Sequence, residues 1–206
     1  MRISAALTFL LAETFVASHP LSPSVDGDLE SVPYETVRVY EGYEERRYTN
    51  VVFACTELVY MAEKEGGEMF NKLFGYISGF NSEAQEIELT VPVISKLVPS
   101  YNMMHKAMCF YLPKKFQENP PQAIDKDVYI VKIKEWVVFV KNFGGFAMRD
   151  SVWVQNAASF INVELAEKAG EVMEGYFFTA SYDSPTKLGN RRNEVMFEKS
   201  RSHDEV

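Results

Sequence analysis

The stretch FYLPKKFQENPPQAIDKDVYI, residues 110–130, decides how this chain is organised. An apolar run ends at its start, a basic and proline-rich connection follows, and a second apolar run begins at Val128. Pro113, Pro120 and Pro121 remove backbone donors and fix φ, so we expect neither a helix nor a central strand to cross it. The stretch is interpreted as a seam, because the same order of elements is expected on both sides.

Before the seam, the hydrophobic pattern predicts two strands, a helix and two further strands. The helix begins near Gly67, and Gly79 is expected to cap its C-terminus. Its apolar stripe consists of Met69, Phe70, Leu73, Phe74 and Ile77. The expected strands cover residues 36–48 with a bend at Gly42, 51–55 after a turn at 48–50, 87–98 with an interruption at Pro92, and 107–112 after a loop at 99–106.

After the seam, the same order is predicted again. Two extended segments are expected within residues 128–140, and strands over 176–182 and 194–198. The helix between them is expected over residues 149–168, with Asp150 or Ser151 as its N-cap and Gly170 just past its end.

The spacing of the two halves supports a duplication. VVFAC and VVFVK both precede a helix and lie 86 residues apart, from Val52 to Val138, while the last strands lie 87 apart, from Phe110 to Phe197. Each half exposes one apolar sheet face, and the two faces can be buried against each other and the helices. We therefore expect one domain over residues 34–199, with halves 34–112 and 127–199.

The N-terminus is typical of a secretory signal peptide over residues 1–18. Arg2 supplies the positive start, residues 3–12 form an apolar run too short to span a bilayer, and residues 16–18 suit cleavage before His19. The alternative is an amphipathic N-terminal helix. A signal peptide predicts a secreted, extracellular protein.

The two ends of the mature chain are expected to be flexible. Residues 19–33 are rich in Pro, Ser and acidic side chains, which predicts a flexible lead-in. Residues 200–206 are polar, which predicts a frayed tail.

Composition sets limits on the class of protein. The 206 residues are 47% apolar, with 15 Phe and 11 Tyr, which is enough for a substantial core. The formal charge of −8 argues against nucleic acid and anionic membranes as partners, because both reward clustered Lys and Arg.

The chain has two cysteines, Cys55 and Cys109, both in apolar strand-like runs. In an oxidising compartment such a pair suggests a disulfide, which would stabilise the fold by roughly 4 kcal/mol by closing a long loop. Two buried free thiols are the alternative.

Motifs for the common catalytic chemistries are absent from the sequence, including a Ser-His-Asp set, HExxH, a phosphate-binding loop and GxGxxG. Adjacent carboxylates such as Glu44 and Glu45 are interpreted as surface groups, because acid–base catalysis needs a pocket that shifts a pKa. The sequence therefore favours a protein that is not an enzyme.

Four segments carry a family resemblance: LTVPVISKLVP, the seam itself, VVFVKNFGGFA and TASYDSPTKLGNRRNEVMF. In order and spacing across residues 34–198 they resemble the SOUL heme-binding protein family. The resemblance implies an α+β fold, a distorted β-barrel of two four-stranded antiparallel sheets flanked by two helices. It also implies a non-enzymatic tetrapyrrole binder, with heme in an apolar groove beside the first helix and the loop before the last strand. The seam is expected to join the halves rather than line this groove.

The site residues implied by the resemblance lie in two segments. On the first helix, Met69, Phe70 and Leu73 would line the groove, and Lys72 would meet a heme propionate. In the loop before the last strand, Lys187 matches a basic residue of the family, with Arg191 nearby. Apolar side chains for the ring and cations for the propionates are the groups that a porphyrin requires.

The sequence departs from the family pattern at two positions. A proposed iron-ligating His of one branch corresponds to Arg47, and a basic residue of another branch corresponds to Gly67. The remaining candidates for an axial ligand are His105, Met103, Met104, Tyr60 and Tyr76, and heme without a protein ligand is equally compatible.

Three hypotheses follow from the sequence. The first is a secreted heme or tetrapyrrole carrier or scavenger. The second is a protein-interaction module of the same fold with no heme bound. The third, ranked last, is an enzyme acting on a small apolar substrate in the groove.

Overall fold

The computed structural model describes residues 29–61 and 67–200. The expected signal peptide, residues 19–28 of the expected lead-in and residues 201–206 of the tail lie outside the described residues. Within the described part of the chain, no helix is long and apolar enough to cross a membrane.

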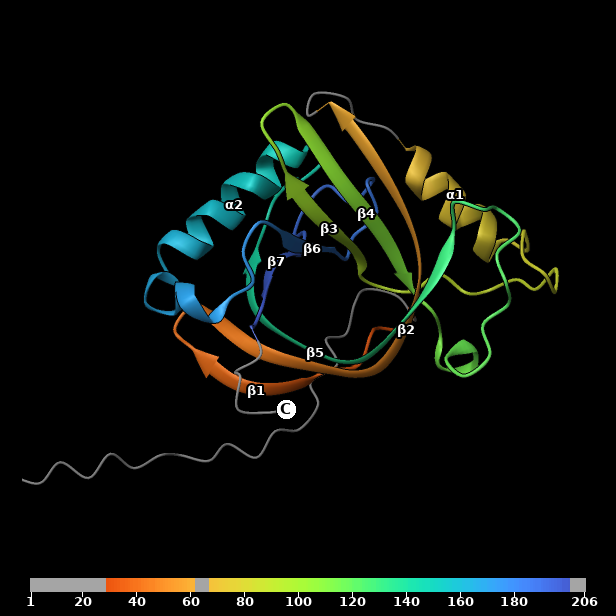
Figure 1. The fold of residues 1–206 in the computed structure, drawn as a ribbon, viewed down its shortest axis with the longest axis horizontal. Coiled ribbons are helices and arrows are strands. Elements are labelled where there is room, and N and C mark those ends of the chain that lie inside the picture. Colours follow the sequence, from red (N-terminus) through yellow and green to blue (C-terminus); the bar gives the residue numbers. More distant parts are fainter. Residues whose placement is uncertain (1–28, 62–66, 201–206) are drawn as a thin grey trace, which may run out of the picture.

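Seven strands form one antiparallel sheet in the order β1-β2-β4-β3-β6-β7-β5, and β5 pairs with β2 to close six of them into a barrel (Figure 1). The helices α1 and α2 lie outside the barrel on opposite sides. The α+β distorted barrel is thus confirmed, as one closed sheet with an extra strand rather than two sheets of four. The strands are β1 (Glu35–Tyr40), β2 (Tyr43–Met61), β3 (Val93–Pro99), β4 (Met103–Tyr111), β5 (Tyr129–Phe143), β6 (Phe177–Ser181) and β7 (Asn193–Glu198), and the helices are α1 (Glu68–Ile77), α2 (Asp150–Asn162) and the 3₁₀ turns η1 (Lys114–Phe116) and η2 (Ala166–Glu171).

The duplicated unit is a strand, a helix and two strands, read as β2-α1-β3-β4 and again as β5-α2-β6-β7. Two ladders join the halves, β2 to β5 and β3 to β6. At the centre of the first, Thr49 pairs with Glu135, and in the second Ile94 pairs with Ala180. Both pairs join residues 86 positions apart (49 to 135 and 94 to 180), so each ladder pairs a strand with its own repeat.

Several predicted strand boundaries are wrong. The bend at Gly42 is a hairpin turn that separates β1 from β2, and β2 continues through the expected turn at 48–50. Asn50 has a positive φ of 51°, so the turn signal marks a kink within a continuous strand. Likewise β5 is one strand of 15 residues rather than two segments.

The segments on either side of β3 also differ from expectation. Residues 87–91 are not a strand and form one isolated bridge, between Val91 and Ser31, although Val93 does begin a strand. The loop expected at 99–106 is short, because β4 already begins at Met103. His105 therefore lies in a strand.

The two main helices end differently. At α1, Gly79 has a positive φ of 101° and the Phe80 N–H donates to the Gly75 carbonyl, which confirms the glycine cap. The helix α2 stops at Asn162 rather than 168, because the chain turns there to bury Leu165 completely. Its N-cap is Arg149, so neither Asp150 nor Ser151 has the expected capping role.

Three apolar clusters fill the fold. One lies inside the barrel, one under α2 and one under α1. The inner cluster includes Val32, whose N–H donates to the Val91 carbonyl, so the end of the predicted lead-in is part of the core.

Charged side chains fill one end of the barrel. Glu194 is completely buried and accepts hydrogen bonds from Arg46, Arg192 and the Tyr182 hydroxyl. Burial and then the charge of Glu194 raise the pKa of Tyr182 well above its usual value, so its hydroxyl stays protonated and donates. The Arg46 guanidinium also stacks on the ring of Tyr34 at 4.2 Å.

The expected disulfide is present. Cys55 of β2 lies directly opposite Cys109 of β4, and the two are bonded with a Cα–Cα distance of 4.1 Å. The bond closes a loop across α1 and β3.

Replacing both cysteines with alanine is expected to lower the free energy of unfolding by about 4 kcal/mol, because a 54-residue separation no longer constrains the unfolded chain. Urea unfolding of the oxidised protein and the Cys55→Ala/Cys109→Ala variant measures this difference. Adding a reductant should destabilise the parent protein and leave the variant unchanged. Equal midpoints for the two oxidised proteins would contradict the prediction.

Candidate functional site

The helix α1 packs on the outer face of β2 and β4. Met69, Leu73, Tyr76 and Ile77 are buried, and the last three join the cluster around Val52, Ala54 and Phe110. Met69 and Leu73, expected in a ligand groove, are therefore part of the packing surface that holds the helix.

One flank of α1 exposes aromatic side chains. Phe70 and Phe74 are 38% and 49% exposed, and their rings stack with centroids 5.9 Å apart. Phe70 also packs edge-on against Phe110 of β4 at 5.4 Å. The sequence pattern assigned both rings to the buried stripe and only Phe70 to the expected site, so the exposure of Phe74 beside it is a feature that the sequence did not single out.

The opposite flank of α1 is polar. Lys72 lies two residues from Phe70, which places it about 200° around the helix. Its amine donates to Asp127 at 2.8 Å and contacts Glu68 at 3.2 Å. An open depression of about 520 Å³ lies on this flank, lined by Lys72, Phe80 and Asp125 among others. Lys72 and the exposed Phe70–Phe74 pair thus face different directions.

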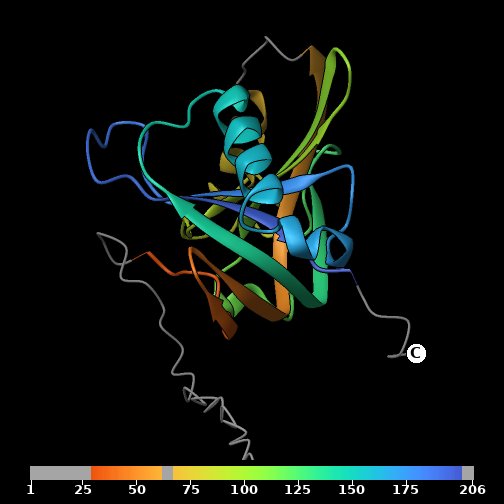
Figure 2. The same cartoon turned by 90° about the vertical axis from the view of Figure 1, so that its left-hand side faces the viewer.

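The loop between β6 and β7 is organised by Arg191. This side chain is buried, and its guanidinium donates to the carbonyls of Asp183, Ser184 and Lys187. It also stacks on Phe146, which lies in the connection between β5 and α2. Figure 2 shows this loop projecting beside that connection. Both terminal nitrogens of the guanidinium bond loop carbonyls, while Nε is buried without a partner. Arg191 therefore shapes the loop rather than offering an exposed cation to a ligand.

Lys187 lies in the same loop and bonds Asp183 at 2.7 Å. The other carboxylate oxygen of Asp183 accepts the backbone N–H of Arg192 at 2.6 Å. Burial alone would raise the pKa of Asp183, but the hydrogen bonds from Lys187 and the Arg192 backbone hold it below its usual range. The loop is therefore closed by an ionised carboxylate.

Strand pairing brings this loop and the aromatic flank of α1 to the same end of the sheet. The loop leaves β6 at Ser181, which pairs with Val93, and Val93 pairs with Phe110. Phe110 is the residue against which Phe70 packs. The backbone of Ser181, where the loop starts, is therefore two strand spacings, about 10 Å, from that of Phe110, on which the aromatic flank packs.

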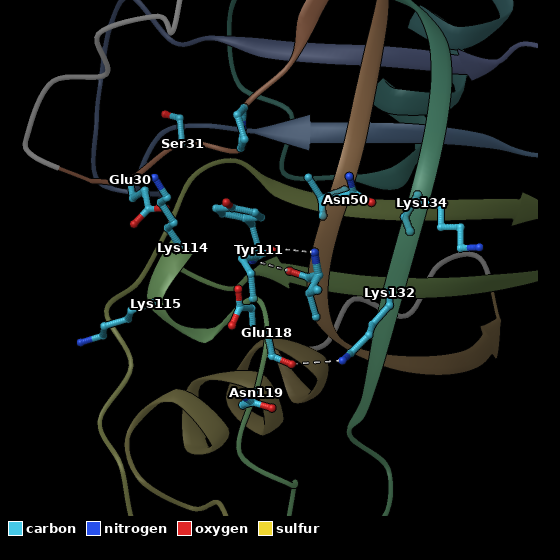
Figure 3. Close-up of a pocket in the computed structure, with 15 residues that line it drawn as sticks. Glu30, Ser31, Asn50, Tyr111, Lys114, Lys115, Glu118, Asn119, Lys132 and Lys134 are labelled. Atoms are coloured by element: carbon cyan, nitrogen blue, oxygen red, sulfur yellow. Dashed lines mark hydrogen bonds between the residues drawn. The ribbon is translucent and has the colours of Figure 1, made fainter.

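A large cleft lies at the seam. Its volume is about 1010 Å³, and it lies between the η1 turn, β2, β5 and the N-terminal segment (Figure 3). Its floor includes Val51, Val52 and Tyr111, and its walls carry four lysines: Lys114, Lys115, Lys132 and Lys134. The seam was expected only to join the halves, but it also lines this cleft.

The seam is fixed to β2 by a side chain. The Gln117 amide accepts from the Val52 N–H at 2.7 Å and donates to the Val52 carbonyl, in place of a neighbouring strand. Figure 3 shows Lys132 directed at the Glu118 carbonyl, with the amines of Lys115 and Lys134 pointing away from the cleft. The cleft is thus bordered by lysines, only some of which point inward.

Candidate iron ligands are not gathered at the aromatic flank. His105 pairs with Glu57 and lies five residues before Phe110 along β4, about 16 Å away. Tyr76 is buried and donates to the Pro121 carbonyl, and Tyr60 donates to Asp150. Met104 is buried under α2, and Met103 begins β4. Among the described residues no cluster of three His, Cys, Asp or Glu could hold a metal ion.

Arg47 and Gly67 are the two positions where the sequence departs from the family pattern. Arg47 contacts Glu35 at 3.2 Å and Glu135 at 3.5 Å across three strands. Gly67 is the N-cap of α1, where an added Cβ would meet only the Asn71 side chain at 3.9 Å. The space at 67 therefore admits the basic residue of other branches.

Comparison with known sequences decides the family. The sequence model of the SOUL heme-binding protein family matches residues 29–198. The chain belongs to this family. Among its relatives, heme-binding protein 2 of Homo sapiens is 35% identical over 61% of this chain and 62% of its own length, so the match spans less than two thirds of that protein. Heme-binding protein 1 of Sus scrofa is 28% identical over 86% of this chain and 96% of its own length.

Solved structures support the fold alone. The C-terminal domain of EcmrR superposes with a TM-score of 0.54 and 13% identity, over 78% of this chain and 99% of that domain. EcmrR in a DNA complex gives a TM-score of 0.56 and 11% identity, over 79% of this chain and 59% of that one.

Acid is expected to open the β6–β7 loop. A depressed folded-state pKa means that Asp183 stabilises the closed loop above its unfolded pKa of about 3.9, and that this contribution is lost as pH falls through the lower folded value. Amide signals of residues 183–192 should therefore shift below about pH 4 in a titration followed by NMR. Asp183→Asn should show the opened-loop signals already at pH 7, whereas Asp125→Asn should not. A pH-independent loop spectrum would refute this.

Proposed function

We propose that this SOUL-family chain is a secreted tetrapyrrole-binding protein, a carrier or scavenger without catalytic activity. The observation that carries the proposal is the stacked, exposed pair Phe70 and Phe74 on α1. Large apolar rings gathered on the surface of a soluble protein mark a binding surface. A flat porphyrin would stack on this pair and cover it.

The chemistry around the pair supports the same ligand. Phe110 of β4 is buried beneath Phe70 and packs against that ring, which supports its position on the surface. Lys187 lies in the loop at the same end of the sheet and would pair with a propionate after leaving Asp183. Lys72, held on the opposite flank by Asp127, would add positive charge only at longer range. The names of the heme-binding relatives add to this support.

The same geometry defines the mode of binding. The candidate ligands His105, Tyr76 and Tyr60 lie away from the aromatic flank or have protein partners. Binding therefore depends on ring stacking and charge rather than on a bond to iron. Iron-free protoporphyrin IX should bind about as tightly as hemin.

Titration of the purified protein with hemin should give a shifted Soret band that saturates at one to one. Phe70→Ser and Phe74→Ser should each weaken binding by about tenfold, which corresponds to 1.4 kcal/mol and to the loss of one aromatic contact. Phe80→Ser is the matched control, because Phe80 is 55% exposed on the other flank.

Two further variants distinguish the groove from the seam cleft. Lys187→Glu should weaken hemin binding, and Lys114→Glu should leave it unchanged. The reverse result would place the ring in the seam cleft. A hemin spectrum identical to that of free hemin across the micromolar range would reject the function.

The alternative is a protein-interaction module that uses the same surface without heme. Arg47 favours it, because this position carries an ion-paired arginine where the family pattern has a proposed iron-ligating His. Recovery from the native fluid of a stoichiometric protein partner, with no pigment, would favour this reading. Phe70→Ser should abolish that recovery if the surface is shared.

Secretion is the remaining part of the proposal. The signal-like N-terminus and a disulfide, which persists in oxidising compartments, both support it. N-terminal sequencing of the protein recovered from culture medium is expected to begin at His19. Retention of the protein in the cell with Met1 intact would exclude the signal peptide.

A further inference from the structure

The barrel is filled at one end and hollow at the other. At the filled end, inward side chains such as Tyr48, Val140 and Met196 are at most 1% exposed, and the Arg46–Glu194 pair lies beside them. At the other end, the inward residues Cys109, Val131 and Phe178 are only partly buried, although all three belong to paired strands. Their exposure is to a cavity of about 300 Å³ inside the barrel.

The cavity wall is mainly apolar and comes from all six barrel strands. The Cys55–Cys109 disulfide forms part of the wall, and Trp136 and Phe178 supply aromatic faces. These two rings meet edge to face at 4.7 Å. Apolar walls with aromatic faces and few polar groups are the usual composition of a small-molecule site, and barrel mouths are a common location.

Charged groups are confined to the rim and have partners. Lys96 lies 3.7 Å from the Tyr176 ring centroid, and Glu198 accepts a hydrogen bond from the Tyr176 hydroxyl. Glu135 contacts Arg47 at 3.5 Å. A charged ligand would have to displace these contacts, whereas an uncharged one would not.

Size and position separate this cavity from the proposed tetrapyrrole groove. Even an eight-stranded barrel holds at most one small ligand, so the interior of a six-stranded barrel is too narrow for a porphyrin. The cavity is lined by Phe178, near the start of β6, and by Glu198, at the end of β7. The loop at 183–191 joins the opposite ends of these two strands. The Phe70–Phe74 pair lies outside the barrel.

We infer that the hollow end of the barrel is a second binding site, which takes a small, uncharged aromatic molecule of two or three rings. The ligand stacks against Trp136 and Phe178 and covers the disulfide. The site acts independently of the groove on α1.

The test uses the uncharged fluorescent probe N-phenyl-1-naphthylamine with the full secreted chain. Its emission should rise and saturate at one probe per protein. Ala107→Phe, which places a ring inside the cavity, should weaken binding at least tenfold. Val39→Phe adds the same ring at a position that is 75% exposed on β1 and should change binding less than twofold.

The two tryptophans supply a second measurement that needs no cavity-filling variant. The chain contains two tryptophans, Trp136 in the cavity wall and Trp153 on the buried face of α2. Their indole N–H signals in NMR spectra can be assigned with Trp136→Phe and Trp153→Phe. Adding the probe should shift the Trp136 signal and leave that of Trp153 in place.

The outcomes separate this site from the groove. Probe binding that survives Phe70→Ser and disappears with Ala107→Phe supports the inference, whether or not the protein binds hemin. Binding that disappears with Phe70→Ser, or an unmoved Trp136 signal at probe saturation, would overturn it.

Discussion

Eleven residue pairs between β2 and β5, from Glu44 with Val140 to Cys55 with Tyr129, close the sheet into a barrel. At each junction between the halves a strand pairs with its own repeat, β2 with β5 and β3 with β6. Both junctions join residues 86 positions apart. The closure also creates an inside and an outside. Once the ring is closed, the two helices have only outer faces to cover, and the interior has to be filled by side chains alone. The filled end, the hollow end and the placement of both helices on the outside all follow from this pairing.

At the filled end, the interior is occupied by a buried charge. Glu194 is completely buried and has no contact with water, and such burial is tolerated only where the charge is paired and its oxygens are hydrogen-bonded. Arg46, Arg192 and Tyr182 together satisfy it. Arg46 belongs to β2, Tyr182 directly follows β6 and Arg192 directly precedes β7, so the network ties the first long strand to the last two. The Arg46–Glu194 ion pair specifies which strands lie together and adds little net stability, because burying two charges costs about as much as their attraction returns.

Most of the fold could be predicted from the sequence, because strand periodicity, the glycine cap at Gly79 and the 86-residue spacing are all local or repetitive signals. The failures have physical causes. A left-handed Asn50 within a strand has the same sequence signal as a turn, and the end of α2 is set by the burial of Leu165, a tertiary effect. At the site, Arg191 has the residue type of a ligand cation, but only the folded loop shows that the side chain is buried and that its terminal nitrogens bond loop carbonyls. The cavity inside the barrel has no sequence signal, because empty space is a property of packing.

The duplication itself indicates where the binding surfaces lie, because the two halves treat their helices differently. The helix α2 buries Trp153 and Phe160 against the barrel, and Leu165 and Val172, on either side of the following turn η2, join the same cluster. The helix α1 has no such following turn among the described residues and leaves Phe70 and Phe74 exposed. Both repeats build the same strand-helix-strand-strand unit, so the unit itself does not require that their helices be covered differently. The exposed Phe70–Phe74 pair is thus a feature of α1 that barrel formation does not explain, and it is the surface on which the proposed binding function rests.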